Sequence, residues 1–260
     1  MLADGAEAAR LVFPHKIHGL IAGAAPPPDI FSRMDRIGVE LTHVYGLTET
    51  YGPATVCAKQ TEWAQLPEGE RGECNGRQGV RYPLQEAVDV LDPSTLEPVP
   101  WDGATMGEVM FRGNIVMKGY LKNPEATDQA FVGGWFHTGD LAVVDRHGYL
   151  KIRDRSKDII ISGGENISSL EVEEILLRHP AIASAAVVAM KDVRWGEVPV
   201  AFVELRSGFN LTEAGVVAHC RGHLAGFKVP KRVILGPLAR TVTGKIQKYA
   251  LRSQLSIEDA

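Results

Sequence analysis

Short apolar runs alternate with stretches of helical periodicity along this chain, and that alternation limits the folds it can adopt. Residues 15–23 form the first apolar run, which ends in the rigid loop Gly23-Ala24-Ala25-Pro26-Pro27-Pro28. Residues 29–39 then place apolar side chains at helical spacing, and residues 41–45 form a second short run. Strands that alternate with helices predict an α/β or α+β fold.

A second pattern begins near residue 86, where the sequence becomes typical of β structure. We expect strands at residues 87–91, 107–113, 141–145 and 149–154. The last two flank Arg146-His147-Gly148, which favours a hairpin with a glycine-containing turn. Asn123-Pro124-Glu125 predicts a helix with an asparagine N-cap and a proline in its first turn.

The polar segment Arg155-Ser156-Lys157-Asp158 separates two apolar strands and marks a change in the sequence. After it, the capping box Ser168-Ser169-Leu170-Glu171 predicts a helix that directs Leu170, Ile175 and Leu176 inward. The remaining elements expected are strands at 187–189, 198–205 and 229–235 and helices at 212–224 and 244–255. The predicted division is residues 1–154, a hinge at 155–158, and residues 159–260.

The composition limits the class of protein. With 28 basic and 32 acidic side chains, the net charge of the 260 residues is −4, whereas a nucleic-acid surface needs a clustered basic excess. The apolar fraction of 45% predicts a packed core, and no apolar run approaches the ~20 residues that span a membrane. Cys57, Cys74 and Cys220 have no CxxC spacing, so a reducing compartment is expected.

The segment Tyr45-Gly46-Leu47-Thr48-Glu49-Thr50 follows a predicted strand and carries the first candidate site. Thr48 could contact a phosphate, Glu49 could bind Mg²⁺, and Tyr45 offers a flat face for a base. The alternative is a polar loop that closes the strand.

Two further segments carry candidate nucleotide-binding residues. Asp140, in His137-Thr138-Gly139-Asp140, could accept hydrogen bonds from a ribose diol, although aspartate is also common in turns. Arg155 offers a planar set of donors, and Gly163-Gly164 allows a ligand to approach the backbone closely. For these the alternative is a charged linker followed by a β-turn.

Near the C-terminus, Thr243-Gly244-Lys245 could bring one cation to a reacting phosphate. The sequence around it lacks the spacing of a Walker A loop, because Ala239 and Ile246 occupy the required glycine and hydroxyl positions. His219 and His223 have the spacing of a zinc-binding pair, but the absence of an obvious third ligand favours a solvated helix face.

In this order, the motifs resemble the AMP-forming acyl-CoA synthetase family of adenylate-making ligases, and most closely its plant-type acyl-activating enzymes. The likeness covers nearly the whole chain. The motifs that carry it are Gly23-Ala24-Ala25-Pro26, Tyr45-Gly46-Leu47-Thr48-Glu49, Gly107-Glu108, Gly119-Tyr120, His137-Thr138-Gly139-Asp140, Asp154-Arg155-Ser156-Lys157-Asp158 and Thr243-Gly244-Lys245.

The resemblance implies an ATP-binding site and a role for each matching residue. Tyr45 would stack on adenine, Thr48 would contact the α-phosphate, and Glu49 would hold Mg²⁺. Asp140 would accept hydrogen bonds from both ribose hydroxyls, with Arg155 supporting the ribose. The other residues that would line the nucleotide and acyl site are Gly23, Ala24, Ala25, Gly46 and Ile152.

The resemblance also implies the reaction. A carboxylic acid and ATP form an acyl-adenylate and pyrophosphate, and coenzyme A then displaces AMP to give acyl-CoA. Lys245 would bridge the carboxylate and the α-phosphate. Lys157 would be the hinge that withdraws Lys245 between the two steps and brings Gly163-Gly164 to the pantetheine arm of CoA.

The resemblance implies a fold as well: the C-terminal part of a large adenylate-forming domain, with a mixed sheet and a β-barrel-like subdomain, followed by a small α+β domain. Two departures qualify it. Ala239-Arg240 replaces a proline-lysine pair, and no Ser/Thr/Gly-rich phosphate loop precedes Gly23.

We therefore expect a fragment of a carboxylate–CoA ligase that has weak activity alone. The alternative is a non-catalytic, truncated protein that binds nucleotide or CoA. The expected partner is a small carboxylic acid rather than a nucleic acid, and the default compartment is the cytoplasm, with peroxisome and plastid as alternatives.

Overall fold

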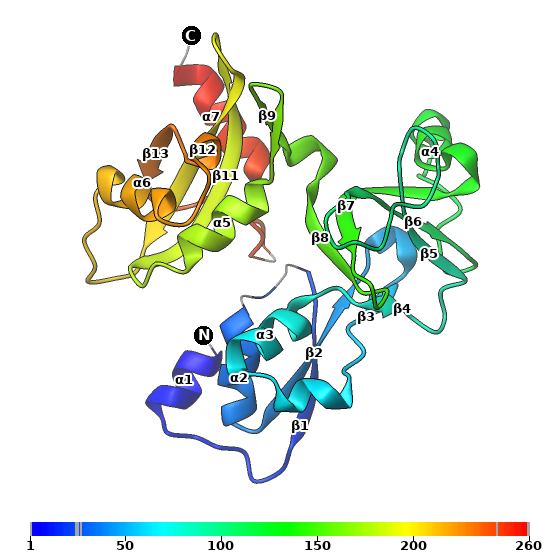
Figure 1. Ribbon diagram of the computed structural model, residues 1–260, viewed down its shortest axis with the longest axis horizontal. Helices are drawn as coiled ribbons and strands as arrows, with labels where there is room; N and C mark the ends of the chain where they lie inside the picture. The colour runs from blue at the N-terminus through cyan, green and yellow to red at the C-terminus, as the bar shows by residue number, and fades with distance from the viewer. Residues whose placement is uncertain (1, 24–25, 27, 243, 259–260) are drawn as a thin grey trace. The chain divides into compact units, whose positions relative to one another are not determined.

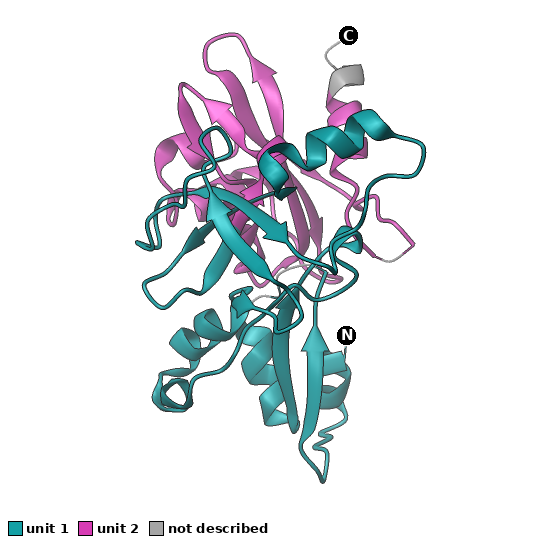
Figure 2. Cartoon of the chain, turned by 90° about the vertical axis from the view of Figure 1, so that its right-hand side faces the viewer, with its two compact units in different colours: residues 1–152 teal, residues 153–260 magenta. Residues whose placement is uncertain are grey.

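The computed structural model describes residues 2–23, 26, 28–242 and 244–258, and it divides into two compact units, residues 1–152 and 153–260 (Figure 2). The expected site residues Ala24 and Ala25, and Thr243 beside Lys245, lie outside the described residues.

The first part of unit 1 is built around a small mixed sheet (Figure 1). β1 and β2 run parallel, and β3 and β4 continue the sheet in antiparallel pairs. Its elements are α1 (Leu2–Ala8), β1 (Ile17–Ile21), α2 (Pro28–Arg36), β2 (Val39–Tyr45), η1 (Thr48–Thr50), β3 (Thr55–Val56), η2 (Thr61–Gln65), α3 (Glu68–Gly76) and β4 (Val80–Arg81).

Helix α2 confirms the helix expected from its apolar spacing, but it ends at Arg36, and β2 begins at Val39, inside the range expected to be helical. Phe31, Met34 and Ile37 are buried together with Val39 and Leu41, so the predicted apolar face packs against β2. α3 was not expected, because the run Glu68 to Gly76 has a low apolar content and three glycines.

The second part of unit 1 is a four-stranded sheet in the order β5-β6-β7-β8. A barrel-like subdomain was expected in this part of the chain. The expected hairpin is confirmed, because Asp145 accepts the backbone N–H groups of His147 and Tyr149 between β7 and β8. The elements are β5 (Ala87–Leu91), β6 (Gly107–Arg112), α4 (Pro124–Ala130), η3 (Val132–Gly134), β7 (Phe136–Val144) and β8 (Leu150–Arg155).

Unit 2 contains a mixed sheet in which β9, β11 and β13 all pair with β12. Its elements are η4 (Ser156–Asp158), β9 (Ile160–Ser162), β10 (Glu165–Ile167), α5 (Ser169–Leu177), β11 (Ile182–Asp192), β12 (Gly196–Leu205), α6 (Glu213–Arg221), η5 (Gly226–Lys228), β13 (Arg232–Leu235) and α7 (Lys248–Glu258).

Both faces of this sheet are covered by helices. Successive side chains of a strand point to opposite faces, so Val187 packs with residues of α5 and α6, whereas Val188 packs with residues of α7. The helices α5 and α6 flank one face of the sheet and α7 the other (Figure 1). The interior of unit 2 therefore consists of two apolar layers, one on either side of one sheet.

Three expectations for unit 2 were wrong in detail. Leu170 is 37% exposed, because the buried face of α5 is formed by Val172, Ile175 and Leu176. The strand expected from residue 229 begins at Arg232, and the helix expected from residue 244 begins at Lys248. The Ser168 N-cap is confirmed, since its hydroxyl accepts the Glu171 N–H.

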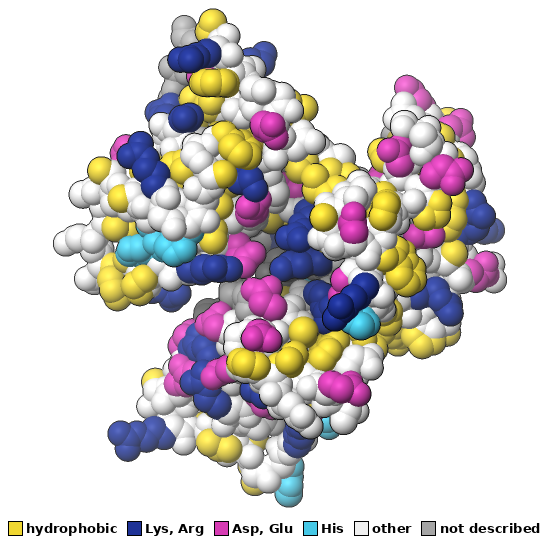
Figure 3. All heavy atoms as spheres, in the orientation of Figure 1, with side chains coloured by type: hydrophobic (Ala, Val, Ile, Leu, Met, Phe, Trp, Pro, Cys, Tyr) yellow, Lys and Arg dark blue, Asp and Glu magenta, His cyan; other side chains and the backbone are white. Residues whose placement is uncertain are grey.

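The surface of the molecule is mixed in charge. On the face shown in Figure 3, acidic and basic side chains are interspersed, in keeping with the balanced composition. Among the described residues, no helix is both long and apolar enough to cross a lipid bilayer.

Candidate nucleotide-binding site

The turn after β2 has a fixed backbone. A Cβ atom at Gly46 would lie 1.9 Å from the Gly52 carbonyl oxygen, so only glycine fits there. The buried Thr50 hydroxyl accepts the Leu47 N–H at 2.9 Å and closes the turn. Thr48 is exposed and Glu49 is half-buried, so both side chains of this turn can reach a ligand.

Tyr45 and Asp140 meet across the fold although they are 95 positions apart. The Tyr45 hydroxyl donates a hydrogen bond of 2.6 Å to Oδ2 of Asp140, which is 5% exposed. Tyr45 and Ile152 also pack against the same apolar cluster in the β5–β8 sheet. The structure thus brings together three of the expected nucleotide-binding residues.

A second carboxylate, Glu108, holds the backbone that carries Asp140. Its Oε1 accepts the Gly139 N–H at 2.7 Å, and its Oε2 lies 2.9 Å from Nδ1 of His137. Thr138 adds a hydroxyl that accepts the Asp140 N–H at 3.0 Å. Glu108 had no role assigned from the sequence, where only its place in the motif Gly107-Glu108 marked it.

One carboxylate oxygen of Glu49 accepts a hydrogen bond. The Tyr120 hydroxyl donates to Oε1 of Glu49 at 3.1 Å, and the pKa of Tyr120 is raised, first by burial and then by this contact. Mg²⁺ in nucleotide sites is commonly held by one or two carboxylates together with substrate phosphates, so Glu49 beside Thr48 fits this use. Tyr120 was not expected as a site residue.

Gly23 lies just beyond the end of β1, at the same end of the sheet as Tyr45 in the parallel strand β2. Loops at the carboxyl ends of parallel strands are the usual place for ligand contacts in α/β folds. This places the Gly23 loop and the Tyr45 turn on one edge of unit 1.

In unit 2, Arg155 and Lys157 are exposed beside and within η4. Gly163 and Gly164 form the two-residue turn between β9 and β10, with φ of 61° and 87°. Both values are positive, as a tight hairpin turn of this kind requires. Gly163 and Gly164 therefore form the β-turn that the sequence offered as the alternative, and a use of this turn for CoA stays a prediction.

Lys245 lies on an exposed loop that is closed at its base. The Gln247 N–H donates to the Ala239 carbonyl at 2.9 Å, and the Lys245 N–H donates to the Thr241 hydroxyl at 3.1 Å. The loop delays the start of α7, which explains the shorter helix.

The histidine pair is engaged in hydrogen bonds. Nε2 of His219 lies 2.8 Å from the Ile175 carbonyl, and Nδ1 of His223 lies 2.9 Å from the His219 carbonyl. Within the ranges that the structure describes, no group of three or more His, Cys, Asp or Glu residues could hold a metal ion.

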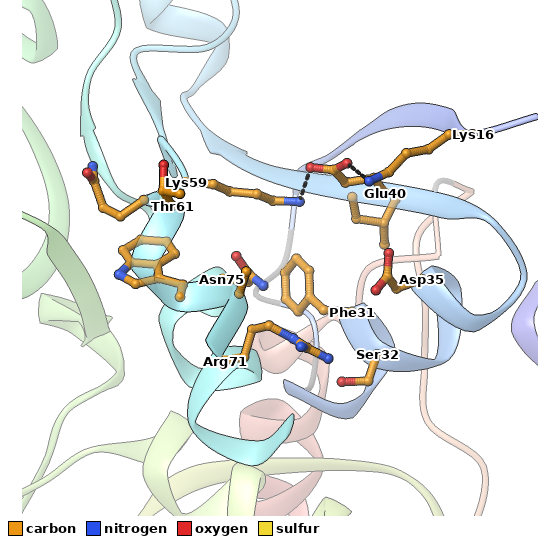
Figure 4. A pocket seen from close by; sticks show the side chains of 13 residues that line it. Lys16, Phe31, Ser32, Asp35, Glu40, Lys59, Thr61, Arg71 and Asn75 are labelled. Atoms are coloured by element: carbon orange, nitrogen blue, oxygen red, sulfur yellow. Dashed lines mark hydrogen bonds and ion pairs between the residues drawn. The ribbon is translucent and has the colours of Figure 1, made fainter. Parts of the chain in front are cut away.

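A separate cavity of about 310 Å³ lies between α2, α3 and β2 (Figure 4). Glu40 lies at its edge and binds both Lys16 and Lys59, while Asn75 and Arg71 face it from α3. None of the expected site residues lines this cavity.

The sequence model of the AMP-binding enzyme family matches residues 1–121, and that of the AMP-binding enzyme C-terminal domain matches residues 171–245. An acetate–CoA ligase of Humulus lupulus is 53% identical over 253 residues, which cover 95% of this chain and 44% of that protein. A peroxisomal acetate/butyrate–CoA ligase of Arabidopsis thaliana is 53% identical over 249 residues, covering 94% and 44%.

Solved structures agree with these sequence matches. The o-succinylbenzoate–CoA synthetase of Bacillus subtilis with its acyl-adenylate has a TM-score of 0.81 and 30% identity, covering 98% of this chain and 49% of that one. The same enzyme with ATP and magnesium has a TM-score of 0.76 and 30% identity, covering 92% and 46%. This chain spans less than half the length of these relatives. The two family matches, the order of the motifs and the fold lead to one conclusion: the chain belongs to the AMP-binding enzyme family.

Proposed function

We propose that this chain carries part of a carboxylate–CoA ligase, which uses ATP to join a small acid to coenzyme A through an acyl-adenylate. The observation that carries the proposal is the hydrogen bond from Tyr45 to the buried Asp140, beside the turn of Thr48 and Glu49. An aromatic face, a buried carboxylate and a hydroxyl-carboxylate turn together suit the base, ribose and phosphates of one nucleotide.

In the first half-reaction, a carboxylate oxygen of the acid attacks the α-phosphorus of ATP, and the bond to pyrophosphate breaks. Asp140 would hold the ribose while Thr48 orients the α-phosphate. Lys245 would place its ammonium between the two negatively charged reactants, which lowers their repulsion as the new bond forms. Mg²⁺, which Glu49 would hold, supplies charge neutralisation to the phosphates when bound.

In the second half-reaction, the CoA sulfur attacks the acyl carbon, and the bond to the AMP oxygen breaks. Because Lys245 assists only the first bond change, we propose that Lys157 is the hinge that withdraws it. The turn at Gly163 and Gly164 would then line the path of the pantetheine arm, where the absence of side chains allows close approach.

The names of the relatives suggest the acid and the compartment. Acetate and butyrate ligases are among them, so we propose a short-chain acid as the substrate. Several relatives are named as peroxisomal, which makes the peroxisome an alternative to the cytoplasm.

The test separates the two half-reactions. The purified chain is given ATP, Mg²⁺ and acetate or butyrate, and pyrophosphate release is measured; separately, it is given butyryl-AMP and CoA, and the thioester is measured. We expect weak adenylation and measurable thioester formation. Lys245→Ala should depress adenylation far more than thioester formation, whereas Lys231→Ala, at an exposed lysine outside the site, should change neither.

Each result has a defined meaning. Equal losses in both steps for Lys245→Ala would contradict the role given to that lysine. Binding of AMP or CoA without turnover in either assay would favour a non-catalytic nucleotide- or CoA-binding protein instead.

A further inference from the structure

Helix α7 begins with a half-buried lysine that neither the sequence nor the proposed chemistry explains. The Lys248 side chain is 17% exposed, and its Nζ lies 2.7 Å from Oε1 of Glu173, which is 13% exposed. Nζ also donates to the Ser169 hydroxyl at 2.7 Å. A lysine is rarely buried without paired charges, so these contacts fix the first turn of α7 against α5.

The contacts continue to the start of the expected hinge. The Ser169 hydroxyl donates to Oδ1 of Asp154 at 3.0 Å, and the Ser169 N–H donates to Oδ2. Asp154 is 1% exposed and also accepts the Arg155 N–H at 2.8 Å. We call Lys248, Glu173, Ser169 and Asp154 the Lys248 network.

A second contact joins α7 to the other side of the hinge. Arg252, four residues after Lys248 and so on the same face of α7, binds the carboxylate of Asp158. Asp158 is buried, whereas Arg155, Ser156 and Lys157 between the two contacts are exposed. One helix face therefore holds both flanks of the exposed hinge residues.

The Lys245 loop lies directly before the same helix, since Lys245 precedes Lys248 by three residues. The loop is held at its other end by Arg240, whose guanidinium binds Ser184 at 2.6 Å and Glu204 at 3.1 Å. Without the Lys248 contacts, the Lys245 loop would be held only at its Arg240 end. Of the two flanks of the hinge, only Asp158 would stay bound to α7.

We propose that Lys248 is a positioning residue that links the Lys245 loop, through Ser169 and Asp154, to the exposed residues 155–157 of the expected hinge. The catalytic role of Lys245 and the movement at the hinge rest on the proposed function, whereas the contacts of Lys248 do not. Asp154 precedes the hinge, whereas Ser169 and Lys248 follow it, so the network ties the two flanks of the hinge together. A rotation at the hinge therefore requires the contacts between Asp154 and Ser169 to break.

The experiment is amide hydrogen exchange on the full 260-residue chain without substrates, resolved by NMR. In Lys248→Met, the amides of Arg155, Gly244, Lys245 and Gln247 should exchange about tenfold faster or more, because their hydrogen bonds depend on the network. Lys248→Arg should restore most of the protection. Lys231→Met, at an exposed lysine, should leave all four amides unchanged.

Ser169→Ala tests the connection in a variant that keeps the Lys248–Glu173 pair and fits a helix start. If the link runs through Ser169, adding Lys248→Met to Ser169→Ala should not speed exchange at Arg155 further. Additive effects at Arg155 would overturn the proposal, as would a uniform increase across unit 2, which signals only lower global stability. Neither result depends on whether the chain makes a thioester.

Discussion

Asp140 has the surroundings that a ribose-binding carboxylate needs. It is buried, its backbone is held by Thr138 and by Glu108 through Gly139, and Tyr45 already orients one oxygen. A carboxylate held in this way loses little conformational freedom when a ligand binds, so hydrogen bonds from two ribose hydroxyls to Asp140 would add to affinity at little entropic cost.

Asp140→Asn should therefore weaken AMP binding by about ten- to a hundredfold, the range expected for lost charge-assisted hydrogen bonds. Isothermal titration calorimetry of the purified chain with AMP measures this. The matched control is Asp128→Asn on the exposed face of α4, which should leave the affinity unchanged. Similar losses at both positions would argue against Asp140 as a ligand-binding residue.

Gly46 offers a test of the turn itself. Gly46→Ala would drive a methyl group into the Gly52 carbonyl, and we expect a loss of at least about 2 kcal/mol in the free energy of unfolding. Gly69→Ala in α3 meets no atom within 4 Å and should instead stabilise by about 0.5–1 kcal/mol. Urea denaturation measures the free energy of unfolding of both variants. We predict that this free energy falls for Gly46→Ala and rises for Gly69→Ala. Equal changes in the two variants would contradict the close contact at Gly46.

At the scale of elements, an ion-pair cluster joins β2 to its neighbours. Glu40 accepts from Lys16 at 2.6 Å and from Lys59 at 2.9 Å, and these contacts lower its pKa from 4.5 to about 2. A lowered carboxylate pKa means that the stabilisation is complete above the unfolded value and disappears as the pH falls through the folded one.

Thermal melts of Glu40→Gln against the parent chain should therefore differ most near neutral pH. The difference in Tm should shrink as the pH falls from 4.5 toward 2, where Glu40 itself becomes protonated. Glu97→Gln at an exposed position serves as the control. A Tm difference that stayed constant across this range would show that the ion pairs do not carry the effect.

Elements with a local signal were predictable from the sequence. The apolar spacing identified α2, and the Asn123 and Ser168 caps identified α4 and α5, because each signal lies within one turn of the helix it marks. The start of α7 was not predictable, since it depends on the loop closed between Ala239 and Gln247. That closure uses backbone groups, which leave no trace in the residue types.

The candidate site was predictable residue by residue but not as an arrangement. Tyr45 and Asp140 were each identified from their motifs, whereas the hydrogen bond between them depends on the packing of β2 against the β5–β8 sheet. The supporting roles of Glu108 and Tyr120 likewise appear only when strands distant in the sequence are brought together.

At the scale of the whole molecule, the two units differ in how completely their sheets are covered. The sheet of unit 2 has apolar layers on both faces. In unit 1, by contrast, β1 leaves Leu20 70% and Ile17 41% exposed in a parallel pair, an arrangement that is normally buried on both sides.

Residues 153–260 expressed alone should consequently melt in one sharp, reversible transition. Residues 1–152 should melt broadly and bind a hydrophobic dye such as ANS, because their exposed apolar strand surface weakens cooperative packing. Calorimetry and dye fluorescence measure the two properties. A sharp, dye-free transition of residues 1–152 would show that β1 needs no further covering.

Because β11 is buried on both faces, unit 2 can accept insertions and deletions only at certain positions. Val187 and Val188 are adjacent in sequence yet belong to different helical layers, so a single inserted residue in the strand would exchange the partners of every side chain beyond it. Deletion or insertion scanning should thus find residues 185–190 intolerant of any change in length. The exposed loop at residues 206–210, which lies between β12 and α6, should accept added residues readily.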